Sequence, residues 1–485
     1  MNLWVIWVVA FLIGILVVGF LFSTKIKTAD DYVMANFSLG FFPICGSVIA
    51  TVTGSAALIG GAGKGFEIGI SYFVTTISFV LFTIVFVVIL GPTIRKLKLY
   101  TIPDLFVRRF GKAAGLIPAI IIGVLYMTPT FSMQIVGMSS ILTSIIDISM
   151  VTGIFIGFFI CVSFTLMGGM PSVAWTDAIQ TVVILAGVIF MFVLGLNHVG
   201  GTKEVIENTP KELFNFFSIG WKELLNYFLI FGPFYIVWQT TWQRLTAAKS
   251  TKIGVWSIIV GFIISGVIGL LGILIGIIAL QSLPAGTDPD LVYTQFLVDV
   301  FPPGIGGLFM ISLLAALLTG ATSFLLSGAI NISKDIYQGW ISPEAEDAQI
   351  LKVARMSVGA MAVLGLAIAL FINDIIEIYQ YALSFTAVTL VMPMLAAMFW
   401  KRSTKKGVII SIIGSLGITL IWRAMGVPFG IHEIAPGLIS SFLLLVIVSL
   451  FTKHSADEEV TTYYFAYKNA KDPTAEVDEE IESTS

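Results

Sequence analysis

Two apolar stretches of the chain carry runs of small and hydroxyl-bearing residues, which can supply oxygen ligands to a hard cation. Residues 46–63 read GSVIATVTGSAALIGGAG, and residues 315–323 read AALLTGATS. Main-chain carbonyls and hydroxyls coordinate hard cations without placing a full charge in an apolar setting. The same residue types also form close helix-packing faces, and their hydroxyls bond back to their own helix. The residue types alone leave both interpretations open.

Two further segments carry residues with possible chemistry. Asp177 is an acid inside an apolar segment, where a carboxylate is costly and marks an ion or proton route, although helix capping is an alternative. Pro233 can break its helix and free carbonyl groups. Tyr235 and Trp238 follow it, several residues inside the expected end of the segment, and this position favours a cavity lining.

The composition indicates whether these segments lie in water or in a lipid bilayer. Of the 485 residues, 57% are hydrophobic and only 11% are charged, whereas soluble proteins carry roughly 25% charged residues. The 26 Lys and Arg nearly balance the 29 Asp and Glu, so nothing indicates a nucleic-acid partner. Two cysteines, Cys45 and Cys161, form neither a disulfide framework nor a metal cluster. The chain is therefore expected to lie in a lipid bilayer.

About thirteen segments are long and apolar enough to cross a bilayer as helices. They are approximately 3–22, 40–62, 68–93, 116–145, 150–166, 174–196, 224–242, 253–280, 306–332, 356–372, 375–400, 408–425 and 434–450. Most Lys and Arg, Arg244 among them, fall into cytoplasmic loops if the N-terminus is outside and the C-terminus is cytoplasmic. We therefore predict an all-α, multi-pass protein of the plasma membrane with that orientation.

Four motifs give the chain a resemblance to a known family. They are Thr28-Ala29-Asp30-Asp31-Tyr32; Gly168-Gly169 with Trp175-Thr176-Asp177 and Gln180; Gln243-Arg244 with Ala247-Ala248-Lys249; and the 315–323 stretch followed by Asp335-Ile336-Tyr337. In this order and spacing the chain resembles the sodium:solute symporter family, whose members carry proline, sugars, pantothenate, choline or sialic acid. The motifs extend over nearly all of the apolar part of the chain.

The resemblance implies a leucine-transporter-like core of two inverted five-helix repeats with flanking helices. Interrupted spans in corresponding positions, the second and the seventh, agree with such a repeat. The division of the chain is then 1–39 for the first helix and an inner loop, 40–197 for the first repeat, 198–223 for an outer loop, 224–400 for the second repeat, 401–452 for two extra helices and 453–485 for an acidic cytosolic tail.

The resemblance also implies a sodium site between the second and ninth spans. Its ligands would be the carbonyls of Ala50, Thr53 and Ala316 and the hydroxyl of Thr319. The family usually has a second hydroxyl at the next position, which is Gly320 here, so weaker sodium binding is expected. Asp177 matches an acid on the inner ion route and offers a proton site instead, because burial raises a carboxyl pKa.

The substrate cavity is expected in the region of Thr51, Val52, Gln134, Tyr235, Trp238 and Gln239. Apolar Val52 and Trp238, with no buried Arg or Lys expected, argue against a strongly anionic solute. We predict cation-coupled symport of a small organic solute by alternating access, with sodium as the coupling ion. A proton-coupled or uncoupled carrier and a solute sensor remain alternatives. The three His fall outside the spans, which argues against an enzyme; the expected partners are the solute, sodium and the bilayer, with no other metal or cofactor and no specified oligomeric state.

Overall fold

The computed structural model describes residues 3–23, 34–167, 170–372 and 374–453, and this part of the chain is helical without a named strand. The Thr28–Tyr32 motif, Gly168-Gly169 and nearly all of the acidic tail lie outside the described residues. The α-helices are α1 (Leu3–Ser23), α3 (Phe41–Val52), α4 (Gly61–Ile68), α5 (Phe73–Lys96), α6 (Ile102–Phe110), α7 (Lys112–Ile120), α8 (Met127–Ile145), α9 (Met150–Met167), α10 (Met170–His198), α11 (Thr202–Asn208), α12 (Gly220–Phe231), α13 (Gln239–Ala247), α14 (Thr251–Ala279), α15 (Val292–Val300), α16 (Pro303–Ile330), α17 (Asp347–Phe371), α18 (Ile375–Phe399), α19 (Lys405–Ala424) and α20 (Ile434–Phe451).

Shorter helical segments join or extend these helices. Three are π-helical: η2 (Ala56–Gly60), η4 (Ile121–Tyr126) and η8 (Asn331–Ile341). The others are the 3₁₀ turns η1 (Ala35–Phe37), η3 (Gly69–Tyr72), η5 (Lys211–Phe214), η6 (Pro233–Val237), η7 (Pro289–Leu291) and η9 (Pro428–Gly430).

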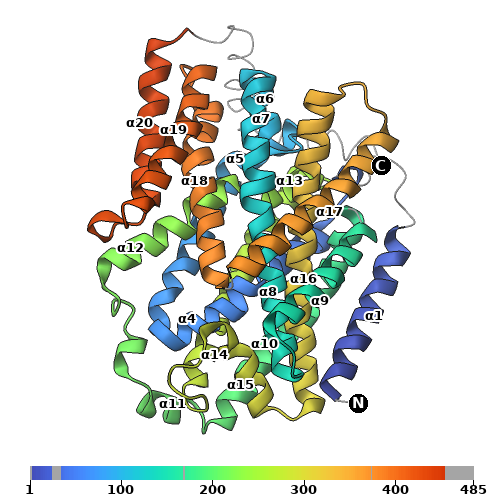
Figure 1. Ribbon diagram of the computed structural model, residues 1–485, viewed down its shortest axis with the longest axis vertical. Coiled ribbons are helices and arrows are strands. Elements are labelled where there is room, and N and C mark those ends of the chain that lie inside the picture. Colours follow the sequence, from blue (N-terminus) through green and yellow to red (C-terminus); the bar gives the residue numbers. More distant parts are fainter. Residues whose placement is uncertain (1–2, 24–33, 168–169, 373, 454–485) are drawn as a thin grey trace.

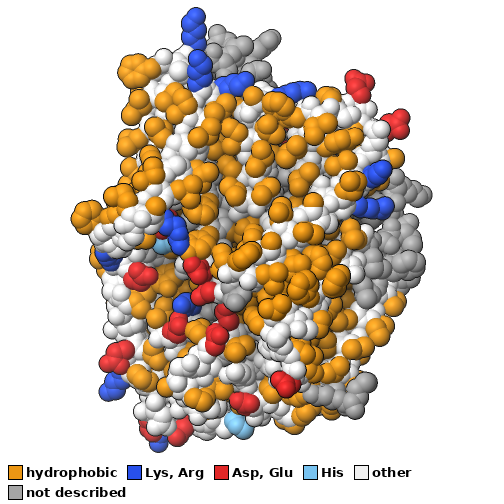
Figure 2. Space-filling view, viewed as in Figure 1, with side chains coloured by type: hydrophobic (Ala, Val, Ile, Leu, Met, Phe, Trp, Pro, Cys, Tyr) orange, Lys and Arg blue, Asp and Glu red, His pale blue; other side chains and the backbone are white. Residues whose placement is uncertain are grey.

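Nine helical stretches of the described chain are long and apolar enough to cross a membrane, and three shorter apolar helices accompany them. The expectation of an all-helical, multi-pass membrane protein is confirmed at this level, while the number thirteen stays a prediction. Hydrophobic side chains cover most of the face in Figure 2, and Lys and Arg side chains gather along its upper edge. An apolar surface of this breadth matches a lipid environment.

The second expected span is interrupted, which is one of the two outcomes that its composition left open. Helix α3 ends at Val52, Thr53 has the non-helical angles φ −87° and ψ 32°, and η2 and α4 follow beyond Gly54 and Ser55. Glycine and β-branched threonine are poor helix formers, so a break at this point costs little. The last carbonyls of α3 lose their partners within the helix and become available to other groups.

The seventh expected span is interrupted as well. Helix α12 ends at Phe231, the turn η6 begins at Pro233, and Trp238 is extended before α13 begins at Gln239. Proline has no N–H group to continue the ladder of α12. Both interruptions expected from the sequence are thus confirmed.

Helix α16 forms the centre of the helix assembly, where it packs against α3, α8, α10 and α17. In its most apolar window 89% of the residues are buried, compared with 28% in α20, which pairs with α19 at the left edge of Figure 1. Helix α14 packs closely on α4 and η2. A Cβ atom at Gly272 of α14 would lie 2.8 Å from the carbonyl oxygen of Ala57 in η2. The interrupted second span therefore packs against α16 through α3 and against α14 through α4 and η2.

Candidate functional site

The break after α3 lies directly against α16. The hydroxyl of Thr319 is placed to donate to the carbonyl of Ala50 at 3.1 Å and to the carbonyl of Ala316 at 2.9 Å. The hydroxyl of Thr53 donates to the carbonyl of Ile49 at 2.7 Å. Ala50, Thr53, Ala316 and Thr319 are all fully buried. Three of the four proposed sodium ligands therefore meet at one contact, and Thr53 lies in the adjoining break; their binding of sodium stays a prediction.

Asp177 lies on α10 at the centre of a buried polar cluster. It accepts a hydrogen bond from the hydroxyl of Ser47 at 2.5 Å, and its carboxylate lies 3.6 Å from the Nη2 atom of Arg244. The guanidinium of Arg244 donates to the hydroxyls of Ser47, Thr51 and Ser323 over 2.7 to 3.0 Å, and to the carbonyl of Thr240 at 3.2 Å. One arginine thus links α13 to α3, α10 and α16.

The burial of Arg244 corrects two expectations, namely that it lies in a cytoplasmic loop and that no Arg or Lys is buried. Arg244 is 2% exposed, and Arg109 on α6 is 1% exposed. The reason is that α13 is surrounded by protein rather than by lipid, so all nine of its residues are buried although several are polar. Asp177 is accordingly not an isolated acid, because a fixed positive charge adjoins it.

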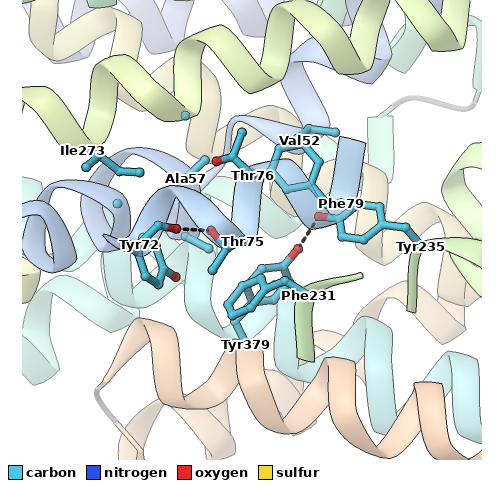
Figure 3. Close-up of a pocket in the computed structure, with 13 residues that line it drawn as sticks. Val52, Ala57, Tyr72, Thr75, Thr76, Phe79, Phe231, Tyr235, Ile273 and Tyr379 are labelled. Atoms are coloured by element: carbon cyan, nitrogen blue, oxygen red, sulfur yellow. Dashed lines mark hydrogen bonds between the residues drawn. The ribbon is translucent and has the colours of Figure 1, made fainter. Parts of the chain in front are cut away.

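A cavity lies beside the break, where Val52, Ala56 and Ala57 line it (Figure 3). It offers about 40 Å³ to water, and five of its thirteen lining residues are aromatic. The hydroxyls of Tyr235 and Tyr379 face each other across one end at 2.9 Å. The cavity is lined by Val52, Ala56, Ala57, Gly61, Tyr72, Thr75, Thr76, Phe79, Phe231, Tyr235, Gly269, Ile273 and Tyr379. None of these lining residues carries a formal charge, so the cavity favours uncharged or internally neutral groups.

Of the six residues expected in the cavity region, Val52 and Tyr235 line this cavity. Trp238 packs its ring against that of Tyr235 at 5.2 Å. Gln239 instead pairs with Asn331 and with the carbonyl of Ser327. Thr51 faces Arg244, and Gln134 accepts a hydrogen bond from the backbone N–H of Ser55 at 3.1 Å. Contact of these residues with a solute stays a prediction.

The aromatic lining was largely missed in the sequence. Tyr72 and Phe79 come from the consecutive elements η3 and α5, whereas Phe231 and Tyr379 come from α12 and α18, which lie far along the chain. Aromatic residues recur throughout these apolar helices, so no spacing singles out the four. Only the packing of the broken spans against α5 and α18 brings them together.

A second group of polar residues lies beside the start of α4, near Gly60 and Lys64. Asp290 in the turn η7 accepts a hydrogen bond from the N–H of Ile375, at the start of α18, at 2.9 Å. Burial is the main cause that raises the pKa of Asp290 to about 7, and the nearby carboxylates of Asp374 and Asp288 add to it. This carboxyl group therefore titrates near neutral pH while it joins the turn η7 to the start of α18.

The chain is similar in sequence and in fold to known transporters. The model of the sodium:solute symporter family matches residues 32–417. The osmoregulated proline transporter OpuE of Bacillus subtilis is 26% identical, with 92% of this chain and 94% of the relative covered. The sodium/glucose cotransporter of Vibrio parahaemolyticus is 24% identical, with 89% and 86% covered. A solved structure of a sodium-coupled sialic acid symporter, substrate-bound and outward-open, superposes with a TM-score of 0.80 at 20% identity, covering 94% of this chain and 99% of that one.

Proposed function

The chain belongs to the sodium:solute symporter family, and we propose from this that it moves sodium and a small organic solute together across a membrane by alternating access. The observation that carries the proposal is the contact between Thr319 and the Ala50 carbonyl at the end of α3. A helix end supplies free carbonyl oxygens, and a neighbouring helix adds a hydroxyl. This is a suitable donor set for sodium, with Ala50, Thr53, Ala316 and Thr319 as ligands.

The solute is proposed to bind in the aromatic cavity beside the same break. The lining has apolar ring faces and a few hydroxyl groups but no formal charge, which suits a small solute that is neutral or zwitterionic. The names of two relatives, a proline transporter and a sodium/glucose cotransporter, fit this class. With about 40 Å³ open to water, the cavity must widen before such a solute can enter.

Coupling follows from the position of the break between the two proposed sites. Val52 lines the cavity, while Ala50, two residues earlier, contacts Thr319. A sodium ion at Ala50 and Thr319 would fix the end of α3 and so favour one shape of the cavity. An ion can shift a conformational equilibrium only through such a difference in affinity between states.

The repeat architecture belongs to the same proposal. The breaks at 53–55 and 232–238 fall in the first helix of the proposed repeats 40–197 and 224–400, as an inverted repeat requires. Thirteen spans, with the N-terminus outside and the C-terminus in the cytoplasm, complete the arrangement. Asp177 belongs to the first proposed repeat and Arg244 to the second, and their ion pair joins the two. We propose that this pair controls the inner ion route.

Uptake into proteoliposomes tests the proposal. Purified protein is reconstituted, and uptake of labelled proline, glucose and sialic acid is followed with an inward sodium gradient, with equal sodium, and with a proton gradient in sodium-free buffer. We expect accumulation of at least one solute only under the sodium gradient. Accumulation driven by protons without sodium would favour the proton-coupled alternative, and no accumulation of any solute would contradict the proposal.

A further inference from the structure

An amide pair joins the second half of the interrupted seventh span to the end of the ninth span. Gln239, the first residue of α13, donates from Nε2 to Oδ1 of Asn331 and accepts at Oε1 from Nδ2 of Asn331 at 3.1 Å. Both side chains are fully buried. Asn331 is also the residue at which α16 gives way to the π-helical segment η8. Segments of π-helix are frequent at functional sites, and this one begins at the contact with α13.

The hydrogen bonds continue from this pair toward the face that is expected to be cytoplasmic. Nδ2 of Asn331 also donates to Oδ2 of Asp335 at 2.9 Å, and Oδ1 of Asp335 accepts from the hydroxyl of Thr101 at 2.7 Å. Thr101 is the N-cap of α6. A carboxylate accepts but does not donate, so Asp335 sets which end of the Asn331 amide faces it. Asp335 belongs to the Asp335-Ile336-Tyr337 motif, which has no part in the proposed ion and solute sites.

The composition of α13 is that of a helix that also meets water. All nine of its residues are buried, yet six of them are polar. The hydroxyls of Thr240 and Thr241 and the Nε2 atom of Gln243 have no partner among the described residues. Buried polar groups are normally hydrogen-bonded, and three unmet groups within four consecutive residues are costly to keep in a permanently buried helix. These groups point to a second state in which α13 is hydrated.

The amide pair also follows directly on the aromatic cavity. Trp238 precedes Gln239, and its ring packs against that of Tyr235, which lines the cavity, at 5.2 Å. Trp238 has extended backbone angles, so it separates α13 from the turn η6. A residue of this kind at the end of an element can act as a hinge. Helix α13 can therefore move away from η8 without the displacement of α12.

We propose that the Gln239–Asn331 pair is the inner gate of the solute route, with Asp335 as the positioning residue that orients Asn331. The gate is closed in this structure, and it has to part before a solute can pass from the aromatic cavity to the cytoplasm. Amide hydrogen bonds suit such a contact, because water replaces them when the two segments separate and the net change in free energy is small. The inference rests on the proposed function, because a gate presupposes alternating access.

Alkylation of a buried thiol tests the gate without any solute. Thr240→Cys places the thiol on α13, next to Gln239, in a chain that also carries Cys45→Ala. The native Cys161, which is fully buried on α9, is kept and reports any general loosening of the protein. Purified protein in mixed micelles is treated with N-ethylmaleimide, and the labelling rate of each thiol is followed by mass spectrometry of peptides. A buried thiol is labelled only when its surroundings open, so each rate measures an opening equilibrium.

Two variants weaken the pair, and a third is the matched control. Asn331→Leu removes the amide at similar volume, and Gln239→Asn keeps an amide that is one methylene too short for both hydrogen bonds. Ser411→Ala is the control, because it removes buried hydroxyl bonds to Ser441 between α19 and α20, outside the proposed repeats. We expect Asn331→Leu to raise the labelling rate of the introduced thiol roughly tenfold and Gln239→Asn to raise it severalfold, with no change at Cys161. Ser411→Ala should leave both rates unchanged.

Asp335→Asn tests the positioning role. An amide can donate to Asn331 as well as accept from it, so the orientation of the Asn331 amide is no longer fixed. We expect the labelling rate of the introduced thiol to rise severalfold, again without a change at Cys161. A rate equal to that of the parent protein would show that Asp335 does not position the gate.

The outcomes distinguish this inference from the proposed function. If Asn331→Leu and Gln239→Asn leave the introduced thiol at the rate of the parent protein, or if Cys161 reacts faster in parallel, the pair is a packing contact and the inference is wrong. Labelling needs neither solute nor a sodium gradient, so this result leaves the proposed function standing where uptake is observed. A wild type that accumulates no solute under any gradient would overturn the proposed function and, with it, this inference.

Discussion

Loss of the Arg244 side chain should destabilise the protein strongly, because it leaves Asp177 as an uncompensated charge in the core. Arg244→Met keeps similar bulk but removes the guanidinium, which donates five hydrogen bonds to four residues. Removal of one partner of a buried ion pair costs about 3–5 kcal/mol. We expect Arg244→Met to lower the free energy of unfolding by that amount.

The size of the interaction can be worked from its geometry. At 3.6 Å and an effective dielectric constant of about 20, opposite unit charges attract by about 5 kcal/mol, from which the cost of desolvating both groups must be subtracted. In a double-mutant cycle with Asp177→Asn, a coupling energy of about 1–3 kcal/mol is therefore expected. The double variant should lose less stability than the sum of the two single variants.

The assay is reversible unfolding in mixed micelles for the wild type, both single variants and the double variant. Arg108→Met is the matched control, because Arg108 pairs with Asp104 at the shorter distance of 2.7 Å but is exposed. An exposed pair contributes only about 0.2–1 kcal/mol. Arg244→Met within about 0.5 kcal/mol of the wild type, or strictly additive effects in the cycle, would refute this reasoning.

Three further predictions concern the cavity, the helix packing and the turn that carries Asp290. Tyr379→Phe removes the hydrogen bond to the hydroxyl of Tyr235 at one end of the cavity, and it should raise the KM for solute severalfold in uptake assays. The sodium concentration that gives half-maximal uptake should change little. Gly272→Ala should destabilise by about 1–3 kcal/mol in thermal unfolding, because its Cβ would lie 2.8 Å from a backbone carbonyl, whereas Gly359→Ala meets nothing within 4 Å and should be neutral or stabilising. The pKa of Asp290 is raised to about 7, so between about pH 4 and 7 the folded protein binds more protons than the unfolded chain. The free energy of unfolding should therefore fall as pH rises through that window, by no more than about 4 kcal/mol. Asp290→Asn should flatten this slope in pH-dependent unfolding; an unchanged slope would show that another group titrates.

The sequence predicted the breaks because their causes are local. Gly54 weakens a helix wherever it occurs, and Pro233 removes a backbone donor regardless of its neighbours. The approach of Thr319 to Ala50 was expected from the family resemblance rather than from any spacing. The structure adds that the contact is made at the helix end, where Ala50 has a carbonyl free to accept.

Other features depend on tertiary packing and were not predictable. Hydropathy places the end of the seventh span near Trp242, since the residues that follow are polar. Arg244 is buried nevertheless, because helices α3, α10 and α16 provide hydroxyls and a carboxylate around it. The pairing of Gln239 with Asn331 likewise joins residues that are distant along the chain.

Sodium is proposed to bind where α16 meets the broken end of α3, and equilibrium binding of radioactive sodium measures this binding itself. Thr319→Val removes the hydroxyl at this contact while it keeps the shape of the side chain. Thr386→Val on α18 is the control, because within the described part of the chain its hydroxyl bonds only to the carbonyl of Ala382 in its own helix. If sodium binds at this contact, Thr319→Val should bind it at least about tenfold more weakly than the wild type and Thr386→Val do. Equal sodium affinity in all three proteins would contradict it.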